Sequence, residues 1–161
     1  KLTQPFEDAA LFLQVVAPRN PLLGLDLGDK TIGIAVSDMH WSIAPPRETI
    51  KRKKFGIDAT ALEAIIDTTF ASGLVLGLPR NMDGSEGPRC QKTRAFARNF
   101  AQRRDIPVLL WDERLSTVAA ERALLEADTS RAKRAEVIDH VAAGYILQGA
   151  LDRIAHIKKD G

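Results

Sequence analysis

Hydrophobic positions along the chain fall into two patterns, separated by polar segments that carry glycine or proline. Short continuous apolar runs predict buried strands, and apolar residues three or four positions apart predict amphipathic helices. In chain order, the predicted strands span residues 22–28, 31–38, 47–52, 74–78 and 107–111. The predicted helices span residues 6–16, 55–72, 88–104, 116–125 and 135–157. Gly73 is expected to end the second helix, and a basic linker is expected at residues 128–134.

This order of elements predicts an α/β fold. A tight, glycine-containing turn joins the first two strands, which predicts an antiparallel hairpin. Later strands alternate with helices, as is typical of parallel strands linked by crossover helices. We therefore expect a mixed five-stranded sheet with helices on both faces. Residues 22–161 are expected to form a single domain, and residues 1–21 an N-terminal extension with a short helix.

The composition is that of an ordinary soluble globular protein of 161 residues, with 45% hydrophobic and 27% charged residues. Its apolar runs are shorter than the roughly 20 residues that span a bilayer, and its beginning does not resemble a signal peptide. Cys90 is the single cysteine, which excludes an internal disulfide, and one cysteine among three histidines gives no zinc pattern. We expect a cytoplasmic protein with no membrane partner.

A net charge of +2 does not by itself indicate nucleic-acid binding, but the basic residues are clustered. The first cluster consists of Arg47, Lys51, Arg52, Lys53 and Lys54. The second consists of Arg80, Arg89, Lys92, Arg94, Arg98, Arg103 and Arg104, and the third of Arg131, Lys133 and Arg134. Solvated surface is the ordinary explanation of such clusters, and a nucleic-acid interface is the functional alternative.

One carboxylate, Asp26, lies inside the first apolar run, near the end of a predicted buried strand. Burying a charge costs several kcal/mol unless another group pairs with it. Such a residue is often a metal ligand or takes part in proton transfer. The structural alternative is an Asp that caps the turn by accepting a backbone N–H.

Three other acids accompany Asp26. Asp112 and Glu113 close the last predicted strand, and Asp139 lies in the final predicted helix. The inward face of that helix is expected to be marked by Ile138, Val141 and Tyr145. Functional sites in such sheets gather where parallel strands end, so these acids are expected to meet there. Carboxylate oxygens suit Mg²⁺ or Mn²⁺, and two such ions about 4 Å apart serve phosphodiester hydrolysis. For each acid alone, a cap or a salt bridge is the alternative.

Four blocks in a fixed order carry a resemblance to the YqgF/RuvX family. They lie at residues 24–38, 77–85 and 112–117 and in the helix around residue 139. Members of that family are described as Holliday junction resolvases or pre-16S rRNA nucleases. The resemblance implies a ribonuclease H-like fold and a magnesium-dependent cytoplasmic nuclease that matures the 5′ end of small-subunit ribosomal RNA. It also implies that Asp26, Asp112 or Glu113, and Asp139 are the catalytic acids.

The source of the second acid is open, because the strand at residues 74–78 ends without one. Strand alternation lets only one of Asp112 and Glu113 face the metal, and Glu113 is favoured for its longer reach. Asp112 would then bond Arg114 or cap a helix. The alternatives in the intervening loop are Asp83 and Glu86. Position 29 is Asp, where the family pattern has Thr, so its role in the turn is open.

Polar residues beside these acids are candidate contacts to phosphate and sugar. They are Lys30, Thr31, Arg80, Asn81, Arg114, Ser116 and Thr117. Surface solubility and helix capping are the structural alternatives. Trp41 and Trp111 are candidates for stacking on bases, although Trp111 fits the core better. His140 is a weak candidate for assisting proton transfer.

Three functions from different classes fit these observations. The first is a metal-dependent nuclease, acting on pre-16S rRNA or, alternatively, on branched DNA as a Holliday junction resolvase. The second is a catalytically weak nucleic-acid-binding factor that acts on ribosome precursors or the transcription machinery. The third is an ATPase, since the first hairpin resembles the phosphate hairpin of the actin and sugar-kinase clan, but a second domain to close over the nucleotide is missing. A monomer or a homodimer is expected.

Overall fold

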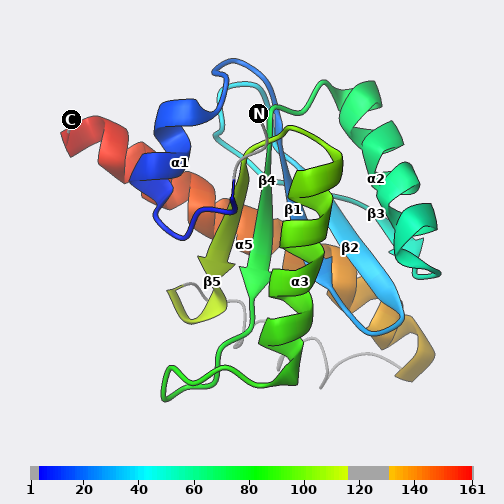
Figure 1. Ribbon diagram of the computed structural model, residues 1–161. Helices are drawn as coiled ribbons and strands as arrows, with labels where there is room; N and C mark the ends of the chain where they lie inside the picture. Colours follow the sequence, from blue (N-terminus) through cyan, green and yellow to red (C-terminus); the bar gives the residue numbers. More distant parts are fainter. Residues whose placement is uncertain (1–3, 116–130, 161) are drawn as a thin grey trace.

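The computed structural model describes residues 4–115 and 131–160, with side chains of the last helix described from residue 141 onward (Figure 1). The described helices are α1 (Ala9–Val15), α2 (Phe55–Thr69), α3 (Pro88–Arg103), the 3-10 helix η1 (Glu113–Leu115) and α5 (Arg131–Asp160). The strands are β1 (Leu22–Leu27), β2 (Thr31–Val36), β3 (Pro46–Lys51), β4 (Gly73–Leu78) and β5 (Val108–Asp112). The predicted helix at residues 116–125 lies outside the described residues.

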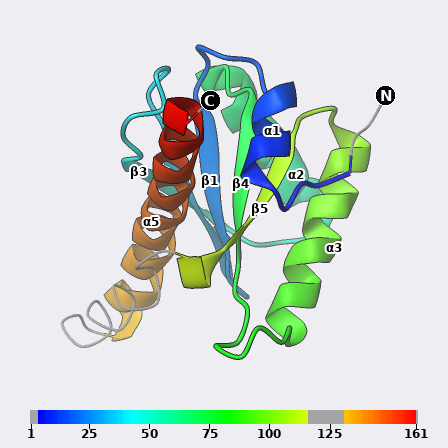
Figure 2. The same cartoon turned by 90° about the vertical axis from the view of Figure 1, so that its left-hand side faces the viewer.

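The five strands form one mixed sheet in the order β3-β2-β1-β4-β5. β1 pairs antiparallel with β2 and parallel with β4, and β4 pairs parallel with β5. Helices cover both faces, with α3 on one side and α5 on the other (Figure 2). The predicted hairpin, the five-stranded mixed sheet and its helical layers are therefore confirmed. Within the described residues, no helix has the length and apolarity to cross a membrane.

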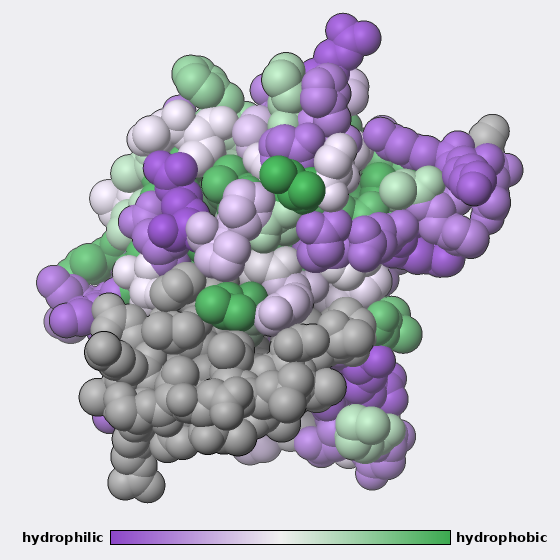
Figure 3. Space-filling view, turned by 180° about the vertical axis from the view of Figure 1, so that it is seen from behind, coloured by the Kyte–Doolittle hydropathy of each residue, from purple (hydrophilic) through white to green (hydrophobic). Residues whose placement is uncertain are grey.

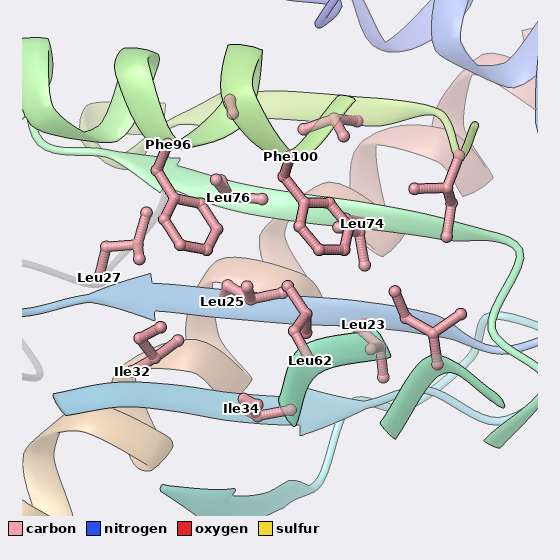
Figure 4. Packing of buried hydrophobic residues seen from close by; sticks show 14 of the residues in the cluster. Leu23, Leu25, Leu27, Ile32, Ile34, Leu62, Leu74, Leu76, Phe96 and Phe100 are labelled. Carbon is pink, nitrogen blue, oxygen red and sulfur yellow. The ribbon is translucent and has the colours of Figure 1, made fainter. Parts of the chain in front are cut away.

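The face of the sheet under α2 and α3 is packed with large side chains. Alternate residues of β1, including Leu23 and Leu25, point to this face and meet Leu62 of α2. Phe96 and Phe100 of α3 stack with their ring centroids 6.2 Å apart (Figure 4). Strand alternation therefore directs the remaining residues of β1 to the opposite face.

The opposite face packs closely against α5. A Cβ atom added at Gly24 of β1 would lie 2.6 Å from Leu147 Cβ and 2.8 Å from the carbonyl oxygen of Ala143. Gly24 therefore lets the helix backbone lie directly on the strand. Figure 3 views this side of the molecule, where hydrophobic residues of the described part form separate groups among hydrophilic ones.

Two predicted helix boundaries are wrong, at the start of the first helix and at the end of the second. Phe6 is not helical: its backbone N–H and carbonyl pair with Val108 and Leu110 of β5, and α1 begins after Asp8, which caps it. Gly73 does not end α2, since the helix ends at Thr69 and its C-cap residue, Phe70, has the left-handed conformation (φ 63°). Gly73 instead begins β4, where a Cβ atom would lie 2.8 Å from Phe12 Cζ.

The last helix is longer than the sequence pattern predicted. α5 starts at Arg131, within the stretch expected to be a linker, and extends to Asp160. Its basic first turn matches no apolar periodicity, which is why the pattern placed the start later.

Candidate active site

Asp26 is a buried carboxylate on the α5 face of the sheet. It is the fifth residue of β1, and alternation places it on the same face as Leu22 and Gly24. Leu22 belongs to the core cluster under α5, and Asp26 is 1% exposed. In register, Asp26 lies opposite Gly33 of β2. The strand backbone therefore fixes the carboxylate inside the protein, close to the carboxyl end of the sheet.

Glu113 reaches the same face from β5, two strands away from β1. It is the first residue of η1 and is 8% exposed. A Cβ atom added at Gly77 of β4 would lie 2.8 Å from Glu113 Oε2. The missing side chain of Gly77 thus provides the space that the Glu113 carboxylate occupies. Because β4 lies between β1 and β5, this carboxylate extends across the middle strand toward the Asp26 side.

Asp112 turns the other way and pairs with Arg114. Its Oδ1 accepts the backbone N–H of Arg114 at 3.0 Å, and its Oδ2 lies 2.8 Å from Arg114 Nη2. These bonds hold the pKa of the Asp112 carboxyl below its ordinary value, with Arg114 as the main cause. The predicted bond between Asp112 and Arg114 is confirmed. Of the two neighbouring acids, only Glu113 lies over β4.

Helix α5 covers the two carboxylates, but its buried face differs from the predicted one. Ala143, Ile146 and Leu147 are fully buried, whereas Val141 and Tyr145 are partly exposed. Tyr145 nevertheless packs against the core cluster under α5, as predicted, whereas Val141 does not belong to that cluster, and the side chain of Ile138 lies outside the described residues. The buried face combines the small Ala143, whose backbone lies close to Gly24, with the larger Ile146 and Leu147.

The backbone of α5 places Asp139 one helical turn before Ala143, which lies over Gly24. The start of α5 lies toward the carboxyl ends of β1 and β4, so Asp139 is displaced from Ala143 toward the Asp26 end of β1 (Figure 1). Its side chain, like that of His140, lies outside the described residues. Among the side chains that are described, no three of His, Cys, Asp or Glu form a metal-binding group.

Arg80 lies within an ionic network rather than standing alone. Its Nη2 lies 3.0 Å from Glu7 Oε1 and 3.3 Å from Glu86 Oε2. Arg94 Nη2 contacts the same two carboxylates at 3.0 and 2.6 Å. The hydrogen bonds from Arg94 lower the pKa of both Glu7 and Glu86. Glu86 is thus engaged in this network.

The loop after β4 closes on itself. Asn81 Nδ2 donates to Ser85 Oγ at 2.9 Å, and Asp83 Oδ1 accepts the backbone N–H of Ser85 at 2.9 Å. Asn81 and Asp83 therefore stabilise the loop in this structure. Arg114 Nη1 reaches the carbonyl of Met82 at 3.5 Å, which links the loop to η1.

The other residues predicted to contact phosphate, sugar or bases lie in the β1–β2 hairpin, in the core or outside the described residues. Lys30 is exposed in the β1–β2 turn, and Thr31 begins β2. Ser116 and Thr117 lie outside the described residues. Trp111 belongs to the core, as favoured. The stacking role of Trp41 is wrong, because its indole is 6% exposed and donates Nε1–H to the Asn20 carbonyl at 2.7 Å.

Sequence reasoning missed the role of Gly77. The signal was present, because a glycine inside an apolar strand often marks a close approach of another group. Sequence reasoning placed Arg52 and Arg89 in basic clusters but did not predict their contacts to the turn, where they donate to the carbonyls of Gly28 and Leu27 at 2.7 and 3.3 Å. These two arginines bind the backbone directly after Asp26.

Comparisons with known proteins agree with this architecture. Residues 20–153 match the family model for RuvX, described as a Holliday junction resolvase. A protein of Ruegeria pomeroyi named "Putative pre-16S rRNA nuclease" is 65% identical, with 91% of this chain and 95% of that protein covered. A protein of the same name from Ruegeria sp. (strain TM1040) is 66% identical, with 95% and 96% covered.

Among solved structures, Thermus thermophilus RuvC in complex with a Holliday junction substrate has a TM-score of 0.54. The match covers 84% of this chain and 96% of the RuvC chain, at 11% sequence identity. This likeness concerns the fold, and it confirms the expected ribonuclease H-like architecture.

Proposed function

The chain belongs to the RuvX family, and on this premise we propose that it is a nuclease that hydrolyses phosphodiester bonds of the ribosomal RNA precursor at the 5′ end of 16S rRNA. The observation that carries the proposal is the placement of Asp26 and Glu113. Both are buried carboxylates on the α5 face, and Glu113 extends over Gly77 toward the strand of Asp26. The relatives named for pre-16S rRNA support this substrate, and a cytoplasmic location is part of the same proposal.

The donor chemistry fits Mg²⁺ or Mn²⁺. Asp26 and Glu113 offer carboxylate oxygens, the ligands that these hard cations prefer, and neither cysteine nor histidine accompanies them in the described site. Asp139, which the α5 backbone brings to this end of the sheet, is the proposed third ligand. Such an ion, when bound, activates water and neutralises charge that develops on the phosphate.

The chain itself supplies orientation and charge. The backbone of β1 fixes Asp26, and Gly77 together with η1 fixes Glu113, so both carboxylates keep their positions while substrate binds. Ile146 packs over Gly77 and limits the water that reaches Glu113. Lys30 in the exposed turn is the proposed phosphate contact next to Asp26. Asp112, paired with Arg114, positions η1 rather than the substrate.

The second candidate substrate is branched DNA, because the family is described as a Holliday junction resolvase. The two substrates make different demands on the assembly. A four-way junction has two symmetric strands to cut, which favours a homodimer, whereas a single RNA end is accessible to a monomer.

The proposal is tested by offering three substrates to the purified protein, with and without Mn²⁺. The substrates are a pre-16S 5′ leader RNA, an unrelated single-stranded RNA and a four-way DNA junction. We expect metal-dependent cleavage of the leader RNA by the natural protein. Asp26→Asn, which keeps the side-chain shape, is expected to bind that RNA as before and to cleave it at least about 100-fold more slowly.

Either of two results would contradict the proposal. Cleavage by Asp26→Asn at the natural rate would exclude Asp26 from the chemistry. Binding of all three substrates without cleavage of any would favour the catalytically weak binding factor.

A further inference from the structure

Cationic side chains gather around the β1–β2 turn, which begins two residues after Asp26. They come from the turn itself, from the end of β3, from the segment that leads into α2, and from the first turns of α3. These segments lie at the same end of the molecule in Figure 1. We call this set the turn patch, and it consists of Lys30, Lys51, Arg52, Lys53, Lys54, Arg89 and Lys92.

Contacts to the turn hold several of these groups in place. Arg52 Nη1 donates to the Gly28 carbonyl at 2.7 Å, and the backbone N–H of Arg52 donates to the Lys30 carbonyl at 2.8 Å. Arg89 Nη2 donates to the Leu27 carbonyl at 3.3 Å. A guanidinium has five N–H donors, so these bonds leave others for an anion. Arg52, Arg89 and Lys92 also line one hollow beside the turn.

Few carboxylates offset this charge. Asp58 is 1% exposed, accepts the backbone N–H of Lys53 at 2.9 Å and lies 3.8 Å from Arg52 Nε. Asp29 lies 3.7 Å from Lys92 Nζ, but both side chains are more than two-thirds exposed. Exposed ion pairs are weak and are screened by salt, so Lys92 keeps most of its attraction for a polyanion. The turn patch therefore carries a clear positive excess.

The opposite side of the site, toward β5, is balanced. There the three arginines Arg80, Arg94 and Arg114 each contact carboxylates within the protein. Those carboxylates are Glu7, Glu86 and Asp112, with Asp83 also adding its charge near Arg114. Phosphate binding on this side would have to replace several partly buried ion pairs, whereas at the turn patch phosphate would compete with the exposed pair between Asp29 and Lys92.

We infer that the turn patch is the main nucleic-acid contact outside the catalytic carboxylates. The substrate backbone leaves Asp26 across the β1–β2 turn and follows the beginnings of α2 and α3, with its phosphates on Lys30, Arg89 and Lys92. This inference rests on the proposed function, since it deepens the account of how the same site takes its substrate. The recognised chemistry is the phosphodiester backbone, without selection of base sequence.

The test is the salt dependence of binding to a labelled single-stranded RNA in EDTA, where no cleavage occurs. Each phosphate contact on a single strand adds about 0.7 to the slope of log affinity against log salt. The double variant Lys30→Ala/Lys92→Ala removes two exposed cations. It is expected to lower that slope by about 1.4 and to weaken binding at 0.1 M KCl by about 25-fold, if affinities converge near 1 M.

The matched control is Arg47→Ala/Lys159→Ala, which removes the same charge from exposed positions away from the turn. The control is expected to keep the natural slope to within about 0.3. Arg80→Ala removes one cation and is expected to change the slope by less than about 0.3, whereas loss of a phosphate contact would change it by about 0.7. Circular dichroism of each variant checks that it is folded.

The outcomes separate this inference from the proposed function. A natural protein that cleaves and binds RNA, together with a turn double variant that keeps the natural slope, would overturn the inference alone. A larger loss in Arg80→Ala than in the turn double variant would place the contact on the β5 side and also overturn it. Failure of the natural protein to bind or cleave any nucleic acid would overturn the proposed function itself.

Discussion

Substituting Gly77 by alanine tests whether the open space above β4 positions Glu113. In the natural protein, this position allows the Glu113 carboxylate and the Ile146 side chain to approach the strand. The new methyl group would clash most closely with Ile146 Cδ1, and it would begin 2.8 Å from Glu113 Oε2 and 3.0 Å from Ile146 Cγ1. Both side chains therefore have to move.

The size of the effect follows from these distances. Ordinary contact between such atoms begins at 3.4 Å, so Glu113 Oε2 has to retreat by about 0.6 Å. Displacements of about 1 Å in a catalytic group cost about 100-fold in rate, so we expect a loss of about 10- to 100-fold. Overpacking of a filled core costs about 1–3 kcal/mol, so the free energy of unfolding is expected to fall within that range.

Gly73→Ala is the matched control, because Gly73 begins the same strand and faces the same layer. Its added methyl group would lie 2.8 Å from Phe12 Cζ and 3.0 Å from Val16 Cγ2, at the other end of β4. We expect a comparable loss of stability in urea unfolding, with the cleavage rate under Mn²⁺ close to that of the natural protein. Equal rates in the two variants, whether both normal or both reduced, would refute the assignment of a positioning role to Gly77.

Two further predictions concern stability. Phe70→Gly is expected to raise the free energy of unfolding by about 1 kcal/mol in urea titration, because Phe70 is left-handed and 75% exposed; an unchanged or lower value would contradict this. The pKa values of Glu7, Glu86 and Asp112 are lowered in the folded state. These carboxylates therefore stabilise the fold fully above the ordinary pKa values, 4.5 for Glu and 3.8 for Asp. The stabilisation is lost as the pH falls through the lowered values. Urea midpoints measured from pH 7 to pH 3 are therefore expected to decline at the acid end, and Arg94→Gln is expected to make that decline shallower; an identical decline in both proteins would exclude Arg94 as the cause.

The local pattern of the chain was enough to predict most of the fold. Continuous apolar runs marked four of the five strands, all except β3, and the tight turn after Asp26 marked the hairpin. The pattern failed where a contact distant in sequence decides the structure. Phe6 joins β5 through Val108 and Leu110, and nothing near Phe6 in the sequence indicates that pairing.

The site was predictable in part, for a similar reason. Strand alternation predicted that Asp112 and Glu113 face opposite sides, and the bond from Asp112 to Arg114 confirms the expected partner. Whether the face of Asp112 or the face of Glu113 is the one that carries Asp26 depends on which face of the sheet α5 covers. A single sequence does not reveal the position of that helix. The engagement of Arg80 by Glu7 joins residues 73 positions apart and was equally hidden. The metal-binding roles of the acids stay predictions.

The central claim is that Glu113, and not its neighbour Asp112, acts with Asp26 in metal-dependent cleavage. Titration calorimetry of Mn²⁺ into Glu113→Gln and Asp112→Asn, paired with cleavage of the leader RNA, tests it most directly. We predict that Glu113→Gln loses both Mn²⁺ binding and cleavage. Asp112→Asn is predicted to keep both and to lose up to about 1 kcal/mol of stability, because its ion pair with Arg114 is lost while the asparagine oxygen still accepts the Arg114 N–H. Unchanged Mn²⁺ binding in Glu113→Gln, with loss in Asp112→Asn, would contradict the claim.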